Sequence, residues 1–307
     1  MSIAFIFPGQ GSQSVGMGAE LSDASAAARQ VFEEVDEALG QNLSRLMRDG
    51  PADELELTAN AQPAIMANAI ATFRAAGVDV TRAAFVAGHS LGEYTALCAA
   101  GALGLAETAR LLRVRGTAMQ EAVPVGEGAM AALIGAEWRQ AEEIAAEAAE
   151  GEVCQAANDN APGQVVISGH KAAVERAMAL AKERGIRRAL LLPVSAPFHC
   201  SLMHPAADRM REALAGAELK TPAVPVFANV TAAAVRQPED IRALLVEQVT
   251  GAVRWRESVL GMVDAGVTHF VEWGGKVLTP MIGRIAPDAR ATSVVGMADI
   301  EKVAGEL

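Results

Sequence analysis

The sequence predicts an α/β fold in which a parallel-sheet unit carries an inserted ferredoxin-like β-α-β-β-α-β unit. Apolar strand patterns alternate with helical patterns at both ends of the chain, which is typical of a parallel sheet. A Pro- and Gly-rich stretch at 123–128 interrupts this alternation, and about seventy residues of a different order follow it. We therefore expect a large subdomain formed by residues 1–125 and 195–307, with an inserted subdomain at 126–194.

The large subdomain begins with an apolar strand at 3–7, which ends in the glycine-containing loop 8–13. Its further elements are predicted from apolar periodicity and from Gly and Pro breaks. They are helices at 24–39 and 62–76, a strand at 83–87, helices at 93–100, 105–121 and 205–214, a strand at 224–228, helices at 241–249 and 256–265, and a strand at 268–272.

The inserted subdomain alternates strands and helices in the order of a ferredoxin-like unit. Its predicted elements are a strand at 129–134, a helix at 140–150, strands at 153–157 and 164–168, a helix at 172–184 and a strand at 189–194.

Composition excludes several classes of protein. The formal net charge of -11 argues against nucleic-acid binding, because no basic stripe is present to neutralise phosphates. No apolar run approaches the roughly 18 residues that span a bilayer, and the segment 1–7 lacks the basic leader of a signal peptide. The three cysteines, Cys98, Cys154 and Cys200, have neither disulfide nor metal-ligand spacing. We expect a cytoplasmic protein with no metal, no membrane contact and no nucleic-acid partner.

The run Gly88-His89-Ser90-Leu91-Gly92 lies between the strand at 83–87 and the helix at 93–100. A serine with glycine two positions to either side, in a strand-turn-helix context, is the layout of a nucleophile elbow. Side chains at the two glycine positions would collide with the neighbouring strand and helix. The hydroxyl would project at the start of a helix, where free N–H groups favour negative charge. Ser90 is therefore the predicted nucleophile.

A serine nucleophile requires a base, and five histidines compete for that role. His199 lies in the loop by which the chain returns from the insertion, and loops at such junctions often line clefts. His89 and His269 are expected to have structural roles, His170 to be exposed at a helix start, and His204 to lie at the entry of a helix. Asp159 is the candidate for a third, acidic member of a triad, but it falls within the insertion.

Two further features leave alternatives open. Helical spacing places Arg115 on the apolar face of the helix at 105–121. A buried guanidinium requires a partner, which is either a structural carboxylate or a carboxylate of the substrate. The loop 8–13 is either a plain strand-to-helix turn or a donor of a backbone N–H to an oxyanion.

Taken together, these segments resemble the malonyl-CoA:acyl-carrier-protein transacylases of fatty acid synthesis over nearly the whole chain. The matching motifs are Phe7-Pro8-Gly9-Gln10-Gly11-Ser12-Gln13, Gly88-His89-Ser90-Leu91-Gly92-Glu93-Tyr94, Arg113-Val114-Arg115-Gly116, Asn158-Asp159-Asn160-Ala161-Pro162-Gly163-Gln164-Val165-Val166 and Pro197-Phe198-His199-Cys200-Ser201-Leu202-Met203. The fold of that family, a hydrolase-like α/β subdomain with a ferredoxin-like insertion, agrees with the organisation above.

The resemblance implies a Ser-His dyad of Ser90 and His199, without a third acid. It implies that the backbone amides of Gln10 and Leu91 form an oxyanion hole, and that Arg115 binds the malonyl carboxylate. It further implies that the backbone carbonyl of Gln248 orients the histidine, and that Asn160 and Phe198 line the substrate pocket. The bulk of Leu91 and Phe198 is similar to that in malonyl-selective rather than methylmalonyl-selective members.

The implied partners are malonyl-CoA and a holo acyl carrier protein, with no cofactor. A serine hydrolase or thioesterase and a non-catalytic carrier-binding module are the alternatives. One departure is that Glu272-Trp273-Gly274-Gly275-Lys276 is one residue shorter than the corresponding family segment. Because it lies far in sequence from the candidate reacting groups, we expect it to affect a local loop or carrier docking rather than the reaction.

Overall fold

The computed structural model describes residues 2–194 and 196–305, and within them two sheets are formed. The larger sheet has the strand order β10-β9-β1-β2-β7-β8 and is parallel except for the β7–β8 pair. Its strands are β1 (Ser2–Phe7), β2 (Phe85–Gly88), β7 (Val226–Ala228), β8 (Ala233–Val235), β9 (Val267–Trp273) and β10 (Arg290–Val294). A parallel-sheet core with a separate antiparallel sheet confirms the predicted fold class.

The parallel sheet is buried on both faces, and β1 shows how the sequence achieves this. Ile3, Phe5 and Phe7 belong to one apolar core, whereas Ala4 and Ile6 belong to another on the opposite face. Alternate side chains of a strand point to opposite faces, so a strand covered on both sides is apolar throughout.

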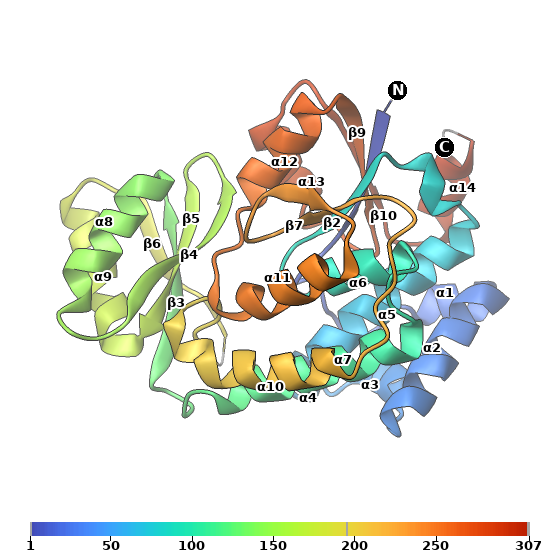
Figure 1. Ribbon diagram of the computed structural model, residues 1–307, viewed down its shortest axis with the longest axis horizontal. Coiled ribbons are helices and arrows are strands. Elements are labelled where there is room, and N and C mark those ends of the chain that lie inside the picture. Colours follow the sequence, from blue (N-terminus) through green and yellow to red (C-terminus); the bar gives the residue numbers. More distant parts are fainter. Residues whose placement is uncertain (1, 195, 306–307) are drawn as a thin grey trace.

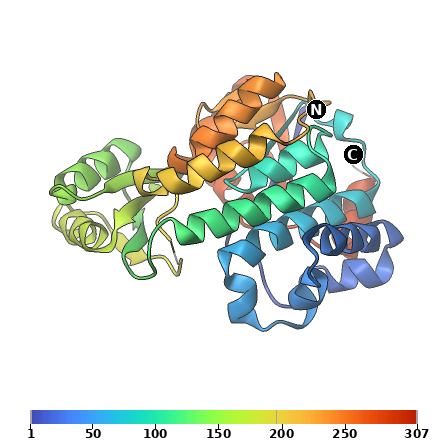
Figure 2. The same ribbon diagram turned by 60° about the horizontal axis from the view of Figure 1, so that its bottom comes forward.

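Helices cover the two faces of this sheet (Figure 1). Their bounds are α1 (Ala19–Ala24), α2 (Ala26–Leu39), α3 (Leu43–Asp49), α4 (Ala52–Glu56), α5 (Thr58–Ala76), α6 (Gly92–Ala99), α7 (Leu105–Glu121), α10 (His204–Ala215), α11 (Pro238–Thr250), α12 (Trp255–Asp264), α13 (Thr279–Ile285) and α14 (Met297–Ala304), with short 3-10 turns at Val80–Arg82 and Ser201–Met203. In Figure 2, α7 runs between α5 and α10.

The antiparallel sheet forms a separate lobe, at the left of Figure 1. Its strand order is β4-β5-β3-β6, and α8 and α9 share an apolar core with it. The elements are β3 (Gly128–Ile134), α8 (Trp138–Ala149), β4 (Cys154–Ala161), β5 (Gln164–His170), α9 (Lys171–Glu183) and β6 (Arg188–Leu191). The predicted order of strands and helices is confirmed. The predicted subdomain boundaries at 125/126 and 194/195 stay a prediction, and residue 195 lies outside the described residues.

Several predicted boundaries were wrong for local reasons. The helix expected at 24–39 is broken at Ser25, whose hydroxyl caps α2 by accepting from the N–H of Ala28. The strand expected at 189–194 ends at Leu191, because Pro193 cannot donate to a sheet ladder. The segment 192–194 instead lines the cavity described below.

Candidate active site

Ser90 lies in the turn between β2 and α6 with a φ of 54°, in the left-handed region. A Cβ at position 88 would lie 1.9 Å from the carbonyl oxygen of Gly92, and a Cβ at position 92 would lie 2.3 Å from that of Phe7. Real Cβ atoms do not approach so closely, so both positions require glycine. The turn therefore has the close packing that the Gly-x-Ser-x-Gly spacing predicts.

Gly88→Ala is expected to lower the free energy of unfolding by about 3 kcal/mol or more, because backbone atoms block the added methyl group. Gly283→Ala is the matched control, since a Cβ there meets no atom within 4 Å and the residue lies within α13. Urea unfolding of both variants measures the difference. Equal midpoints for the two variants would contradict the packing argument.

Ser90 Oγ lies 2.7 Å from His199 Nε2. The Nδ1 of His199 lies 2.9 Å from the backbone oxygen of Gln248 and 3.1 Å from that of Gly251. A carbonyl only accepts hydrogen bonds, so Nδ1 carries the proton and Nε2 is the unprotonated nitrogen that faces the serine. Ser90 therefore donates its hydroxyl proton toward His199.

The imidazole of His199 is 3% exposed. Burial, together with the nearby charge of Arg115, lowers the pKa of His199 to about 3. The ring is therefore neutral at pH 7 and is able to accept a proton.

Arg115 is buried on α7, as its spacing predicts, with 1% of its surface exposed. Nη1 donates to Oε1 of Gln62 at 2.8 Å, and Nη2 donates to Oε1 of Gln248 at 2.9 Å and to Oγ of Ser90 at 3.2 Å. Its guanidinium carbon lies 5.7 Å from the centroid of the Tyr94 ring. No carboxylate among the described residues lies within ion-pair distance of it. The charge of the buried Glu93 carboxylate acts on it from farther away, and Gln248 bridges the two side chains.

Two residues that the sequence analysis missed hold the elbow in place. Asn229, directly after β7, accepts the N–H of Ser90 at 2.7 Å through Oδ1 and donates to the carbonyl of Gly88 at 2.7 Å. Oε2 of Glu93, in the first turn of α6, accepts from the N–H of Asn229 at 3.0 Å and from Nε2 of Gln248 at 2.7 Å. A polar residue at the carboxyl end of the strand next to the elbow strand was the available signal for Asn229.

Burial raises the pKa of Glu93 to about 7, although hydrogen bonds from Asn229 and Gln248 and the charge of Arg115 oppose the rise. In the unfolded chain the carboxyl titrates at 4.5, so between 4.5 and about 7 the folded state holds a proton that the unfolded state has lost. Raising the pH through this window therefore favours unfolding.

We expect the wild-type protein to lose about 3 kcal/mol of unfolding free energy relative to Glu93→Gln as the pH rises from 4.5 to 7. Urea unfolding at pH 4.5, 5.5, 7 and 8 measures this difference. If the wild type instead became more stable relative to Glu93→Gln as the pH rises, the attraction between the charges of Glu93 and Arg115 would outweigh the cost of burying the carboxylate.

A cavity of about 360 Å³ opens in front of Ser90 and His199, which is within the range of small-molecule sites. Gln10, Asn160 and Phe198 line it, together with residues of the antiparallel sheet and of the segment before α13. Arg115 does not line the cavity, but its Nη2 lies 3.2 Å from Oγ of Ser90, which does. The guanidinium is therefore one hydrogen bond away from a group in the cavity wall.

The backbone N–H groups of Gln10 and Leu91 belong to residues beside the cavity and beside Ser90, respectively. Gln10 lies in the loop after β1, and Leu91 directly follows Ser90 at the start of α6. Neither N–H donates a hydrogen bond to any group in the described parts of the chain. Gly9 packs this loop against the elbow, because a Cβ there would lie 2.8 Å from the carbonyl oxygen of His89.

The other histidines have structural partners or lie on the surface. His89 bonds to Oδ1 of Asn160 at 2.7 Å, and buried His269 bonds to Thr292 at 2.9 Å. His170 accepts the N–H of Val153 through Nδ1, and exposed His204 begins α10.

Asp159 is not a third member of a triad. Its carboxylate pairs with Nε of Arg256 at 2.9 Å. The two backbone carbonyls described above occupy Nδ1 of His199 instead.

The segment Glu272–Lys276 directly precedes residues that line the cavity. A Cβ at Gly275 would lie 2.8 Å from Pro8, in the loop that carries Gln10. The buried carboxylate of Glu272 accepts the N–H groups of Val277 and Leu278, which line the cavity. The separation in sequence between this segment and Ser90 therefore does not indicate how far apart the two lie in the fold.

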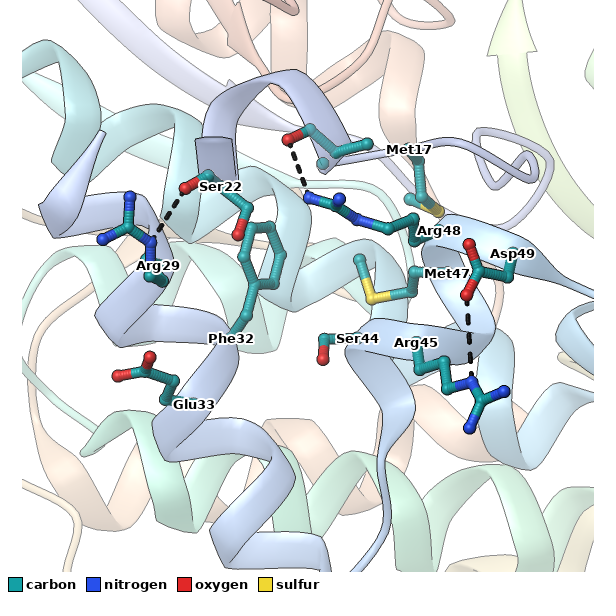
Figure 3. A pocket seen from close by; sticks show the side chains of 12 residues that line it. Met17, Ser22, Arg29, Phe32, Glu33, Ser44, Arg45, Met47, Arg48 and Asp49 are labelled. Carbon is teal, nitrogen blue, oxygen red and sulfur yellow. Dashed lines mark hydrogen bonds and ion pairs between the residues drawn. The ribbon is translucent and has the colours of Figure 1, made fainter. Parts of the chain in front are cut away.

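A second cavity, of about 280 Å³, lies among α1, α2 and α3 (Figure 3). Its three arginines already have partners within the chain. Arg29 donates to the carbonyl of Ser22, Arg48 to Asp23 and Ala19, and Arg45 pairs with Asp49. No histidine lines this cavity, so it holds no pair like that of Ser90 and His199.

Within residues 2–194 and 196–305, no helix is both long and apolar enough to cross a bilayer. The same residues contain no group of three or more His, Cys, Asp and Glu side chains able to hold a metal ion.

Comparison with known proteins agrees with this geometry. The family model for the acyl transferase domain matches residues 4–276. A malonyl CoA-acyl carrier protein transacylase of Bacillus subtilis is 45% identical over 306 residues, covering 98% of this chain and 95% of that protein. The chain belongs to the malonyl CoA-acyl carrier protein transacylase family.

Solved structures of this family superpose closely on the chain. The acyl-carrier-protein-S-malonyltransferase of Bartonella henselae is 53% identical, with a TM-score of 0.97 over 99% of this chain and 100% of that one. A malonyl-transacylase solved in complex with a type II PKS acyl-carrier protein is 40% identical, with a TM-score of 0.96 over the full length of both.

Proposed function

We propose that this protein transfers the malonyl group of malonyl-CoA to the phosphopantetheine thiol of an acyl carrier protein, through a malonyl ester on Ser90. The observation that carries the proposal is that Oγ of Ser90 contacts both neutral His199 and buried Arg115, beside a cavity that Ser90 and His199 line. The names of the family relatives and the solved carrier complex support the choice of donor and acceptor. The transfer supplies malonyl groups for fatty acid synthesis.

In the first half-reaction, Ser90 Oγ attacks the thioester carbonyl carbon while His199 Nε2 takes the hydroxyl proton. The N–H groups of Gln10 and Leu91 stabilise the resulting oxyanion. The carbon–sulfur bond then breaks, and the CoA thiolate leaves with the proton from His199. A malonyl-serine ester remains.

In the second half-reaction, the carrier thiol gives its proton to His199 and attacks the ester carbonyl. The serine oxygen leaves and recovers the proton from the imidazolium. The main-chain carbonyl of Gln248 holds the ring in the required tautomer throughout. The dyad therefore needs no third carboxylate and no cofactor.

Selectivity comes from Arg115 and from the cavity walls. The guanidinium presents a planar pair of donors that matches a carboxylate, which acetyl groups lack. Phe198 lines the cavity, where its bulk disfavours a 2-methyl branch on the substrate, whereas Leu91 is buried beside Ser90 and does not line the cavity. Asn160, held by His89, also lines the cavity. We place the activity in the cytoplasm, where the unpaired Cys98, Cys154 and Cys200 stay reduced.

Incubation with malonyl-CoA and holo carrier, followed by mass analysis of the carrier and assay of free malonate, tests this function. We expect malonyl-carrier to form much faster than free malonate, and no transfer to apo carrier, which lacks the thiol. Malonate release that matches transfer in rate would indicate a thioesterase. Carrier binding without acylation of Ser90 would indicate a binding module.

A further inference from the structure

The carboxylate of Glu93 is buried and does not line the cavity. The two groups that donate hydrogen bonds to it belong to Asn229 and Gln248, and each of these residues also contacts members of the candidate site. Glu93 lies three residues after Ser90 and is 2% exposed. A single oxygen, Oε2, accepts from the backbone N–H of Asn229 and from the side-chain amide of Gln248. Burying a carboxylate is costly, so its retention here requires an explanation.

The first of these contacts leads to the nucleophile. Asn229 bonds on both sides of the elbow, accepting the Ser90 N–H at 2.7 Å and donating to Gly88 at 2.7 Å. Ser90 has a left-handed backbone conformation, which non-glycine residues keep only when surrounding contacts impose it. By fixing the backbone of Asn229, Glu93 helps to impose that conformation.

The second contact leads to the base and to the arginine. The Glu93 oxygen is an acceptor, so it selects the NH₂ end of the Gln248 amide and leaves Oε1 to face Arg115 Nη2 at 2.9 Å. The NH₂ group also donates to the carbonyl of Ser90 at 3.0 Å. The backbone oxygen of the same glutamine holds His199. The side-chain amide of Gln248 therefore contacts Arg115 and Ser90, and its backbone carbonyl contacts His199.

We propose that Glu93 is a positioning residue whose carboxylate oxygen, acting through Asn229 and Gln248, holds Ser90, His199 and Arg115 in register for malonyl transfer. This inference rests on the proposed function, which assigns the roles of those three residues. The operative property is the acceptor oxygen at the position of Oε2. A glutamine side chain can supply the same acceptor without the charge.

The test compares the wild type with Glu93→Ala, which removes the acceptor, and Glu93→Gln, which keeps it. Leu97→Ala on the same helix is the control for lost stability, because it removes a buried side chain that does not belong to the network. Single-turnover acylation of Ser90 is measured at pH 8 with malonyl-CoA and with acetyl-CoA. The ratio of the two rates does not depend on the fraction of folded enzyme, so a merely structural loss leaves it unchanged.

We expect Glu93→Ala to lower the malonyl-to-acetyl rate ratio by about tenfold or more, because Gln248 no longer holds Arg115 in one orientation. Glu93→Gln should recover the ratio to within about threefold of wild type, and Leu97→Ala should leave it unchanged. A wild-type ratio in Glu93→Ala, or an equal loss in both Glu93 variants, would overturn the proposal.

Two further variants keep the test decisive. If Glu93→Ala does not fold, Glu93→Asp, whose shorter side chain withdraws the acceptor, is measured in its place with the same expected fall. Arg115→Ala is measured in parallel. If it leaves the ratio at the wild-type value, the carboxylate clamp assigned to Arg115 fails, and the inference about Glu93 fails with it. Failure of the proposed function itself is distinguishable, because the wild type would then form no malonyl ester on Ser90.

Discussion

Arg115→Ala is expected to lower kcat/KM for malonyl-CoA by roughly 150- to 5000-fold while changing the value for acetyl-CoA far less. In the proposed complex, the carboxylate of the substrate pairs with a guanidinium that forms no ion pair with a carboxylate of the described residues. Removing the arginine leaves the buried carboxylate unpaired, and such a loss costs about 3–5 kcal/mol. Acetyl groups have no such carboxylate.

Arg115→Lys is the matched control for charge. Lysine keeps the positive charge but lacks the planar fork, so an intermediate loss with malonyl-CoA is expected. Steady-state kinetics with both thioesters measure these effects. Equal losses for the two substrates in Arg115→Ala would remove the argument for a carboxylate clamp.

His199→Ala is expected to slow malonylation of Ser90 by about 10³-fold, because no other group then accepts the serine proton. His204→Ala is the matched control. Among the described histidines, His204 is the nearest to His199 in sequence and lies exposed at the start of α10, so Ser90 of this variant should be malonylated at the wild-type rate. Rapid-quench mass spectrometry of the acyl-enzyme measures both rates. Similar rates in the two variants would exclude His199 as the base.

The elbow and the inserted unit could be predicted because short-range rules govern them. A Cβ at position 88 would meet the carbonyl of Gly92 within the same turn, and a Cβ at position 92 would meet the carbonyl of Phe7 on the neighbouring strand. The Gly-x-Ser-x-Gly spacing is thus a local signature of both requirements. The burial of Arg115 follows from helical spacing alone. The alternation of strands and helices in the insertion likewise follows from apolar periodicity.

The remaining parts of the site depend on main-chain groups and on long-range contacts. The two acceptors of the His199 proton are backbone carbonyls, and a carbonyl leaves no signature in residue type. Glu93 and Asn229 meet across the elbow although they are far apart in the chain. The family resemblance pointed to the Gln248 carbonyl but not to its side-chain amide, which bonds to Glu93 and Arg115.

The small elements that the sequence analysis missed have a similar explanation. β8 and β10 are short strands at the two edges of the parallel sheet. Short edge strands carry too few residues for a clear alternation of polar and apolar side chains. Helix α13 begins where Glu272, on β9, accepts the N–H groups of residues 277–279. Such a capping contact is fixed by the packing of the loop rather than by a local capping motif.

The most direct test of the mechanism is the intact mass of the protein after brief exposure to malonyl-CoA, with the adduct located by peptide mapping. We predict one malonyl group on Ser90, which disappears when holo acyl carrier protein is added and is absent from Ser90→Ala. A malonyl adduct that persists in Ser90→Ala, or one that carrier does not discharge, would contradict the proposed malonyl-serine intermediate.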